Sequence, residues 1–278
     1  MSPGTLYRLS AFTTNPSQGN PAGVWVGDAL PDAATMQRIA TSVGFSETAF
    51  VVPKRGSDRT IRYYSPEAEV AFCGHATIAT GVLLGELEGD GTYGLDTLEG
   101  RILVTVRTRD GKLEASLTSV EPRFELASDE LLNRVLGSLG WGRNELDRSI
   151  PPARAYAGVW HLVLAASDAQ RLASLNYDFP GLKAIMIQDC LTTIQLIWRE
   201  RPTVFHSRNP CPVGGVVEDP ATGAAAAALG GYLRDSGLVK PPIALTIFQG
   251  ETMGRASRLN VDIPVAGGIV VSGNAVRI

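Results

Sequence analysis

A glutamate held among apolar neighbours is the residue of this chain best suited to moving a proton. Glu47 lies between Ser46 and Thr48, with Phe45 and Phe50 close by in the sequence. Apolar surroundings disfavour the charged form of a carboxylate, which suits a group that exchanges protons with carbon. A strand-end glutamate in contact with water is the alternative for this position taken alone.

A histidine and a cysteine stand close together at a second position. The segment 73–77 reads Cys-Gly-His-Ala-Thr and opens a run of small apolar residues. A thiol near a helix N-terminus can ionise more readily, although a buried, unreactive cysteine is the commoner case. A histidine at such a place, here His75, is either a polar site residue or a hydrogen-bonded structural one.

The third position is an acidic pair that leads into a helix of alanines. Residues 218–223 read Glu-Asp-Pro-Ala-Thr-Gly and precede the run 224–229. We expect Asp219 to be the N-cap and Pro220 to lie in the first helical turn. Alanine offers no polar face, so the helix should be buried on all sides, with an N-terminus that suits a carboxylate or phosphate. A capped core helix with nothing bound is the alternative.

These positions form an internal repeat. The segments 73–77 and 220–224 each follow a short strand that contains valine, and each opens a helix of small residues. Two halves of similar size predict a pair of related domains with a small-molecule site where they meet. Glu47 and Asp219 would then supply two carboxylates to one site, the arrangement that an acid–base isomerase needs.

Other patterns bear on metals and cofactors. No group of His, Cys, Asp and Glu has the sequence spacing of metal ligands, so we expect no zinc site. No phosphate-binding glycine loop, dinucleotide-binding fingerprint or Gly-x-Ser-x-Gly elbow occurs in the chain. We therefore expect no cofactor.

Composition excludes several classes of function. The chain has 278 residues, 44% hydrophobic and 19% charged, and a formal net charge of −3 without a basic run, so nucleic acid is not an expected partner. No apolar run has the length of a membrane span, and the N-terminus lacks the pattern of a signal peptide. Its three cysteines are widely spaced, which fits a reducing cytoplasm better than a disulfide framework.

Periodicity and turn residues predict further elements. They are a first strand at residues 6–12, a helix from Pro31 with Met36, Ile39 and Ala40 on its apolar face, a hairpin of strands 100–106 and 112–117 turning at Asp110-Gly111, a linker at residues 122–152 that carries an amphipathic helix, a strand at 184–187 and a loop at 205–215.

Five blocks of sequence, taken in order, carry a resemblance to a known family. They are Gly19-Asn20-Pro21-Ala22-Gly23-Val24, Ser46-Glu47-Thr48-Ala49-Phe50, Cys73-Gly74-His75-Ala76-Thr77, Glu218-Asp219-Pro220-Ala221-Thr222-Gly223, and Gln249-Gly250 with Met253-Gly254-Arg255. Over nearly its whole length the chain resembles the PhzF-like family of phenazine biosynthesis. The best-known member of that family isomerises trans-2,3-dihydro-3-hydroxyanthranilate without a cofactor.

The resemblance implies an α+β fold like that of diaminopimelate epimerase. In it two similar domains each wrap a curved, mostly antiparallel, barrel-like sheet around a central buried helix. We place an N-terminal domain at residues 1–120 and a C-terminal domain at 121–278, with the last strand, near 268–278, returning to the first domain. The resemblance also implies a homodimer.

Carried over position by position, the resemblance assigns roles to individual residues. Glu47 corresponds to the general acid/base of the family, and His75 and Asp219 to its polar site residues. The remaining predicted substrate contacts are Asn20, Cys73, the amides of Gly74 and Gly223, and Ala224. Ala224 stands where the family has serine, so a hydroxyl that could contact substrate is missing.

Three functions are consistent with these residues. The first is a cofactor-independent isomerase in which Glu47 moves a proton between carbons of a small carboxylic acid. The second is a two-base racemase or epimerase, which in related enzymes needs a cysteine at each helix start; here Cys73 would face Pro220 at the matching position. The third is a non-catalytic protein that binds a small molecule on the same scaffold.

Overall fold

The chain forms two compact units. The computed structural model describes residues 4–278. Unit 1 comprises the residues up to Thr118 together with Ser272–Ile278, and unit 2 comprises Ser119–Val271. The predicted division of the chain into two domains near residue 120 stays a prediction.

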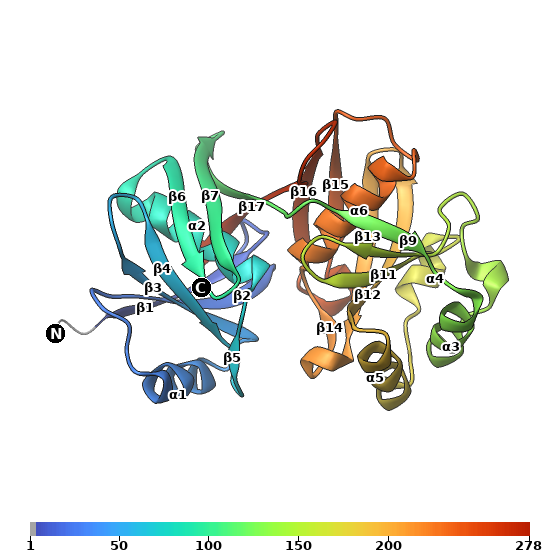
Figure 1. Ribbon diagram of the computed structural model, residues 1–278, viewed down its shortest axis with the longest axis horizontal. Coiled ribbons are helices and arrows are strands. Elements are labelled where there is room, and N and C mark those ends of the chain that lie inside the picture. Colours follow the sequence, from blue (N-terminus) through green and yellow to red (C-terminus); the bar gives the residue numbers. More distant parts are fainter. Residues whose placement is uncertain (1–3) are drawn as a thin grey trace. The chain divides into compact units, whose positions relative to one another are not determined.

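Unit 1 is a closed sheet around a helix (Figure 1). Successive strands pair in the ring β1–β2–β3–β4–β6–β7–β8–β17, and β17 closes it by pairing with β1. The pairings β2–β3 and β4–β6 are parallel, and the other pairings whose direction is known are antiparallel. The strands are β1 (Thr5–Ala11), β2 (Asn20–Val26), β3 (Glu47–Pro53), β4 (Arg59–Tyr64), β5 (Glu69–Val70), β6 (Gly91–Thr97), β7 (Gly100–Arg109), β8 (Lys112–Thr118) and β17 (Val270–Arg277).

The helix inside this ring is α2 (Gly74–Glu88). Every residue from His75 to Gly85 is buried, which is the outcome expected for a helix of small residues without a polar face. Gly81 lets the sheet approach closely, since a Cβ there would lie 2.6 Å from Val104 Cγ1 and 2.9 Å from Ala115 Cβ. The second helix of the unit, α1 (Ala33–Val43), lies outside the ring and begins at the N-cap Asp32.

Unit 2 likewise combines a run of paired strands with one buried helix. Its strands are β9 (Arg123–Leu126), β10 (Ala153–Tyr156), β11 (Trp160–Ala165), β12 (Leu191–Arg201), β13 (Val204–Cys211), β14 (Val216–Asp219), β15 (Ile243–Gln249) and β16 (Ser257–Ile263). Its helices are α3 (Asp129–Leu139), α4 (Ala169–Ala173), α5 (Phe179–Gln188) and α6 (Gly223–Asp235), with short 3-10 turns η1 (Arg143–Glu145), η2 (Pro212–Gly214) and η3 (Glu251–Met253).

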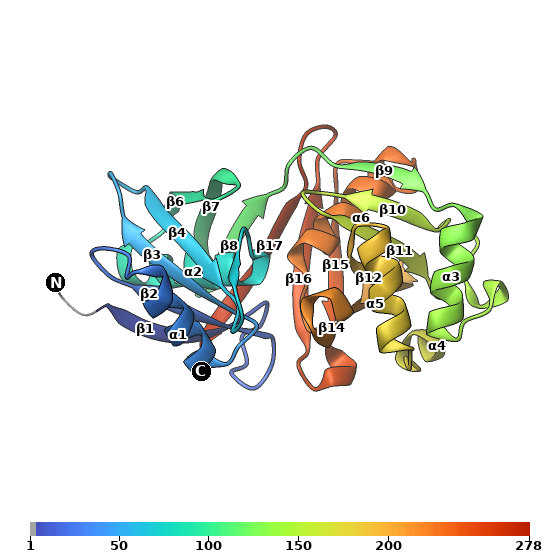
Figure 2. The ribbon, with the colours of Figure 1, turned by 60° about the horizontal axis from the view of Figure 1, so that its bottom comes forward.

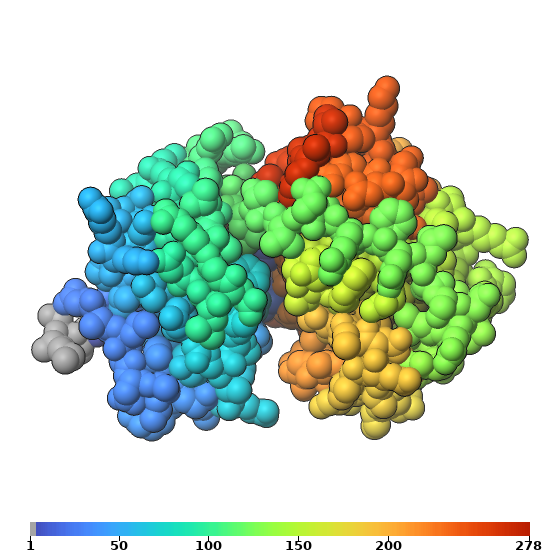
Figure 3. Space-filling view, in the orientation of Figure 1, coloured from blue at the N-terminus to red at the C-terminus, as the bar shows by residue number. Residues whose placement is uncertain are grey.

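The two units share an order of elements. In each, a short strand (β5 or β14) precedes the buried helix (α2 or α6), and the helix connects two parallel neighbours, β4 to β6 or β13 to β15. Figure 2 shows α6 lying against the strands of unit 2 and α3 and α5 lying on their outside. In the space-filling view α3 (green) and α5 (yellow) form part of the outer surface of this unit (Figure 3). The predicted α+β fold, with a buried helix in each half, is confirmed.

Several local predictions are confirmed. The β7–β8 hairpin turns at Asp110-Gly111, where both residues have positive φ, as a type I′ turn requires. The predicted helix with Met36 and Ala40 on its buried face is α1, and α3 ends at Gly140 in the left-handed region. No helix among residues 4–278 combines the length and apolar character needed to cross a bilayer.

The predicted start of the alanine-rich helix is wrong. Helix α6 begins at Gly223 with Thr222 as N-cap, so Asp219 is not the cap and Pro220 is not in the first turn. Asp219 instead ends β14, where it pairs with Asn209 of β13. Pairing with β13 extends strand β14 as far as Asp219, the residue at which the local capping signal predicted the start of the helix.

Three further predictions are corrected in unit 2. The predicted loop at 205–215 is largely strand β13, because it pairs with β12, β14 and β15 despite its Asn-Pro turn signal. The predicted strand at 184–187 lies in helix α5, which Asp178 caps by accepting from the Gly181 N–H. The predicted linker at 122–152 is folded, since the apolar face of α3 belongs to a buried core with α5 and β12.

Candidate active site

In unit 1 the predicted site residues gather at the N-terminus of α2. Cys73 is the N-cap residue, and its side chain does not cap the helix. The first-turn N–H groups of a helix have no intrahelical acceptor, so they can bind an anion. Thr77 fixes this turn, because its hydroxyl donates to the Cys73 carbonyl at 2.6 Å and lies 2.6 Å from the buried Tyr63 hydroxyl. The predicted amide site at Gly74 is therefore on a firmly held turn.

Glu47 reaches this turn from the sheet. It is the first residue of β3, which runs parallel to β2 with Ala22 opposite Glu47. Asn20 begins β2 and is buried, so both residues lie at the same end of the ring. The Glu47 side chain remains 22% exposed, which leaves its carboxylate open to a ligand.

His75 connects these groups. Its Nε2 atom lies 3.4 Å from Oε2 of Glu47 and 3.3 Å from Oγ of Ser46. Its Nδ1 atom lies 3.4 Å from Sγ of Cys73. The structure thus brings Glu47, Cys73 and His75 into one cluster, and places Ser46, which was not among the predicted site residues, beside them.

This cluster overturns the reason given for expecting no metal site. One ligand atom from each of Glu47, Cys73 and His75 lies within 4.8 Å of the others. These residues come from β3 and from the start of α2, so their proximity is not visible in sequence spacing. Carboxylate, thiolate and imidazole are all ligands of zinc.

In unit 2 Asp219, Gly223 and Ala224 lie around the N-terminus of α6. Thr222 donates its hydroxyl to Oδ2 of Asp219 at 2.6 Å and, as N-cap, does not cap the helix through its side chain. Gly223 is buried, and Ala224 is partly exposed. Because Cys73 and Thr222 are the N-cap residues of the two buried helices, Thr222 and not Pro220 is the counterpart of Cys73. The two-base mechanism with paired cysteines therefore lacks its second thiol.

A buried glutamine holds this second turn. The Gln249 amide donates to the Asp219 carbonyl at 2.7 Å and to the Thr222 hydroxyl at 3.0 Å, and it accepts from the Thr222 N–H at 3.2 Å. Gly250 allows close packing, since a Cβ there would lie 2.7 Å from the Pro220 carbonyl oxygen. Gln249 belongs to one of the five blocks of sequence, but this positioning role was not predicted. The available signal was an amide side chain next to a turn glycine.

A buried polar chain lies behind Asp219. His161 contacts the Thr193 hydroxyl at 2.8 Å, and that hydroxyl donates to Oδ1 of Asn209 at 3.0 Å. Because the hydroxyl proton goes to Asn209, the Nδ1 atom of His161 must be the donor of the first bond. Burial lowers the pKa of His161 to about 3, so the imidazole is neutral. The Asn209 amide in turn donates to the Ser207 hydroxyl at 3.1 Å, and Asn209 is the partner of Asp219 across β13 and β14.

The turn η3, which follows Gln249, contacts an ion-paired histidine of β13, His206. Nδ1 of His206 lies 2.7 Å from Glu251 and Nε2 lies 2.9 Å from Glu200. Burial lowers the pKa of His206, but its hydrogen bonds and charge interactions with Glu200 and Glu251 outweigh this, and the net pKa is raised. The contacts of His206 with Glu251 and Glu200 thus tie the start of η3 to β12.

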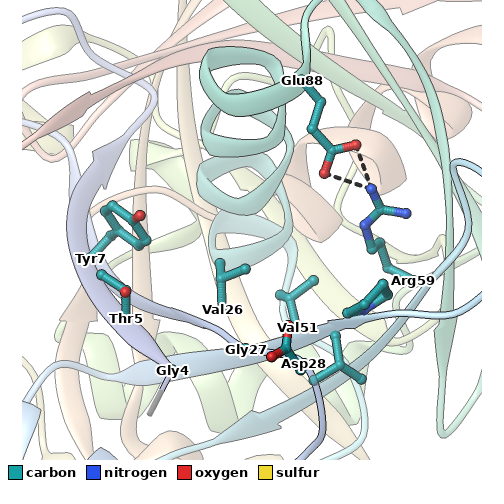
Figure 4. A pocket seen from close by; sticks show the side chains of 11 residues that line it. Gly4, Thr5, Tyr7, Val26, Gly27, Asp28, Val51, Arg59 and Glu88 are labelled. Carbon is teal, nitrogen blue, oxygen red and sulfur yellow. Dashed lines mark hydrogen bonds and ion pairs between the residues drawn. The ribbon is translucent and has the colours of Figure 1, made fainter. Parts of the chain in front are cut away.

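A cavity of about 360 Å³ lies elsewhere in unit 1. It is lined by Val51 and Val52 near the end of β3 that is opposite to Glu47, and by Glu88, the last residue of α2 (Figure 4). Arg59 in its wall is paired with Glu88 and also donates to the carbonyls of Gly56 and Asp58. The charge of Arg59 is thereby paired, and none of the predicted site residues lines this cavity.

Comparison with known proteins places this arrangement in a family. The model of the family PhzC-PhzF, described as phenazine biosynthesis-like protein, matches residues 9–278. The chain belongs to the PhzC-PhzF family. The predicted resemblance to PhzF-like proteins is thereby confirmed, and the chain is an enzyme of this isomerase family.

Relatives in this family carry isomerase names. An uncharacterized isomerase of Deinococcus radiodurans is 32% identical over 95% of this chain and 89% of its own length. The trans-2,3-dihydro-3-hydroxyanthranilate isomerase of Pseudomonas aeruginosa is 31% identical over 96% of this chain and 94% of its own.

Solved structures show the same fold. The PhzF-family phenazine biosynthesis protein of Bacillus anthracis has a TM-score of 0.86 and 25% identity, covering 98% of this chain and 96% of its own. A hydroxyproline epimerase of Agrobacterium vitis, solved with trans-4-hydroxy-L-proline, has a TM-score of 0.68 and 15% identity, covering 99% of this chain and 90% of its own. At that identity the likeness concerns the fold alone.

Proposed function

We propose that this PhzC-PhzF protein is a cofactor-independent isomerase of a small carboxylic acid, in which Glu47 carries a proton from one carbon to another. The observation that supports this best is the position of the Glu47 carboxylate. It is partly exposed and lies 3.4 Å from His75, next to the N-terminus of α2. A proton acceptor thus stands beside a helix end that favours an anionic substrate.

The step moves one proton and one double bond. The Glu47 carboxylate takes a proton from a carbon of the substrate, and the electron pair of that C–H bond forms a new double bond as the old one shifts. The carboxylic acid of Glu47 then returns the proton to the carbon at the far end of the shifted system. No electrons are gained or lost, so the reaction needs no redox partner.

His75 has a supporting role in this proposal. Contacts to Ser46, Glu47 and Cys73 hold its ring, so it can donate a hydrogen bond to the substrate or to Glu47 as charge develops. The amides of Gly74 and its neighbours would bind the substrate carboxylate. The proposal also assigns contacts with the same substrate to Asp219, Gly223 and Ala224 of unit 2 and to Asn20 of unit 1. The homodimer and the cytoplasmic location are further parts of the proposal.

Proton transfer to carbon is tested in heavy water. The purified chain is incubated with trans-2,3-dihydro-3-hydroxyanthranilate and, separately, with other small unsaturated carboxylic acids, and deuterium in the product is located by NMR. We expect a shifted double bond, with deuterium at the carbon that receives the proton whenever the Glu47 proton exchanges with solvent. Binding of an acid that is never isomerised or deuterated, across such a panel, would favour the non-catalytic alternative.

A further inference from the structure

We propose that Glu47, Cys73 and His75 form a binding site for a soft divalent cation, represented by Zn²⁺, and that the bound cation blocks the acid/base. Each residue offers one ligand atom, and the three atoms lie within 4.8 Å of one another. A mixed set of thiol, imidazole and carboxylate differs from the all-oxygen sets that Mg²⁺ and Ca²⁺ prefer. The donor set therefore selects zinc-like cations.

The separations between these atoms fit one small ion. With Zn–N near 2.0 Å and Zn–S near 2.3 Å, two ligand atoms on a tetrahedral zinc lie roughly 3.3–3.7 Å apart. Nε2 of His75 is 3.4 Å from Oε2 of Glu47 and 3.9 Å from Sγ of Cys73. The separations of Nε2 from these two atoms would thus change by only a few tenths of an ångström, and the ligand atoms of Glu47 and Cys73, which lie within 4.8 Å of each other, would have to approach. The Ser46 hydroxyl, 3.3 Å from the same nitrogen, would have to turn away.

The local charges favour a reversible complex. The Cys73 thiolate and the Glu47 carboxylate together balance the charge of a divalent ion, and the N-cap position stabilises the thiolate. The positive end of α2 opposes a cation, so the affinity should be below that of a structural zinc site. Nδ1 of His75, 3.4 Å from Sγ, can keep its proton and orient the ring.

The consequence for activity rests on the proposed function. A carboxylate oxygen that coordinates a metal no longer offers its lone pair to a substrate proton. Three protein ligands leave one position for water, as in many zinc sites. We assign an inhibitory role, because the cation occupies the same carboxylate that the proton transfer requires.

Metal binding is tested without any activity measurement. The reduced full-length chain is titrated with Co²⁺, whose thiolate complexes absorb through sulfur-to-metal charge transfer, and Zn²⁺ is then added to displace it. We expect a band that saturates at one equivalent, is absent in Cys73→Ser, is strongly weakened in His75→Ala, and persists in the control Cys190→Ser. Absence of the band, or its survival in Cys73→Ser, would overturn the site.

Inhibition is tested separately by product formation in the assay described above. We expect one to two equivalents of Zn²⁺ to lower the rate at least tenfold, with full recovery after chelation. In Cys73→Ser the ratio of the rates with and without Zn²⁺ should return close to one. A rate that is unchanged or increased by Zn²⁺ would overturn the inhibitory role while the cobalt titration still decides the site. Conversely, a chain without isomerase activity that gives the cobalt band would refute the proposed function alone.

Discussion

The Nε2 atom of His75 lies 3.4 Å from the Oε2 atom of Glu47, so the start of the buried helix α2 and the start of strand β3 share one polar cluster. The helix contributes open amide groups and an imidazole, and the strand contributes a carboxylate that is partly exposed. This relationship supports proton transfer next to a bound anion.

Replacing Glu47 by glutamine should abolish the proton carrier while keeping the shape of the side chain. We expect turnover to fall by about 10²–10⁴-fold, the usual contribution of a general acid/base, with an unchanged circular dichroism spectrum. Product formation measures the loss. The exposed Glu67→Gln is the matched control and should retain full activity. Equal activity in both variants would reject the role of Glu47.

Replacing Gln249 by leucine should loosen the turn between Asp219 and Thr222. The substitution removes the amide that donates to the Asp219 carbonyl and accepts from the Thr222 N–H, at a site that is 1% exposed. Leaving buried partners unsatisfied should lower the free energy of unfolding by about 1–3 kcal/mol, measured by urea denaturation. The exposed Gln170→Leu on α4 should have little effect. If Asp219 acts on substrate, turnover at saturation should also fall in Gln249→Leu.

Two glycine-to-alanine substitutions should change stability in opposite directions. At Gly81 of α2 the new methyl group would meet Val104 and Ala115 at under 3.0 Å, so overpacking should lower the free energy of unfolding by about 1–3 kcal/mol. At Gly137 of α3 nothing lies within 4 Å of the added Cβ, so the better helix propensity of alanine should raise it by about 0.5–1 kcal/mol. Thermal unfolding of the two variants compares these signs directly, and a more stable Gly81→Ala variant would contradict the packing described for α2.

His206 should make stability depend on pH near neutrality. Its pKa is raised in the folded chain, so its contribution is fully present below the unfolded pKa of about 6.5 and is lost as pH rises through the folded value. We expect the stability difference between the wild type and His206→Gln to shrink above pH 6.5, measured by urea denaturation at several pH values. A difference that grows with pH would show that the pairs with Glu200 and Glu251 do not hold the protonated form.

Ala224→Ser tests the proposal that the start of α6 contacts substrate. Position 224 is partly exposed in the first turn, so a serine can be accommodated there. Under the proposed function, the restored hydroxyl should raise turnover of trans-2,3-dihydro-3-hydroxyanthranilate relative to the wild type, while stability changes by less than about 1 kcal/mol. Product formation with this acid and with smaller acids separates an effect on the substrate range from a general gain. No change with any substrate would argue against a contact at this position.

Much of the fold could be predicted from local sequence. The alanine-rich run of α6 and the small residues of α2 predicted helices buried on all sides, and both are buried. The turn at Asp110-Gly111 depends on neighbouring residues only, and this prediction is confirmed. Such features follow from the conformational preferences of short segments, and these preferences do not depend on contacts with the rest of the chain.

Where pairing partners decided the outcome, local signals were misleading. Residues 205–211 read as a loop, yet three neighbouring strands draw them into β13. Residues 184–187 read as a strand, yet α5 is a helix whose Leu182 and Met186 are fully buried. Asp219 read as a helix cap, yet β14 continues to it because Asn209 pairs there.

The candidate site divides in the same way. Glu47, Cys73, His75 and Asp219 were chosen from residue type and resemblance, and their presence belongs to the sequence itself. Only the tertiary structure decided that Glu47, Cys73 and His75 lie within 4.8 Å, with Ser46 beside the imidazole, and that Gln249 holds the turn at Asp219. The physical reason is that the parallel pairing of β2 with β3 and the burial of α2 inside the ring set these distances. Both depend on contacts between segments that are remote in the chain, which no local pattern encodes.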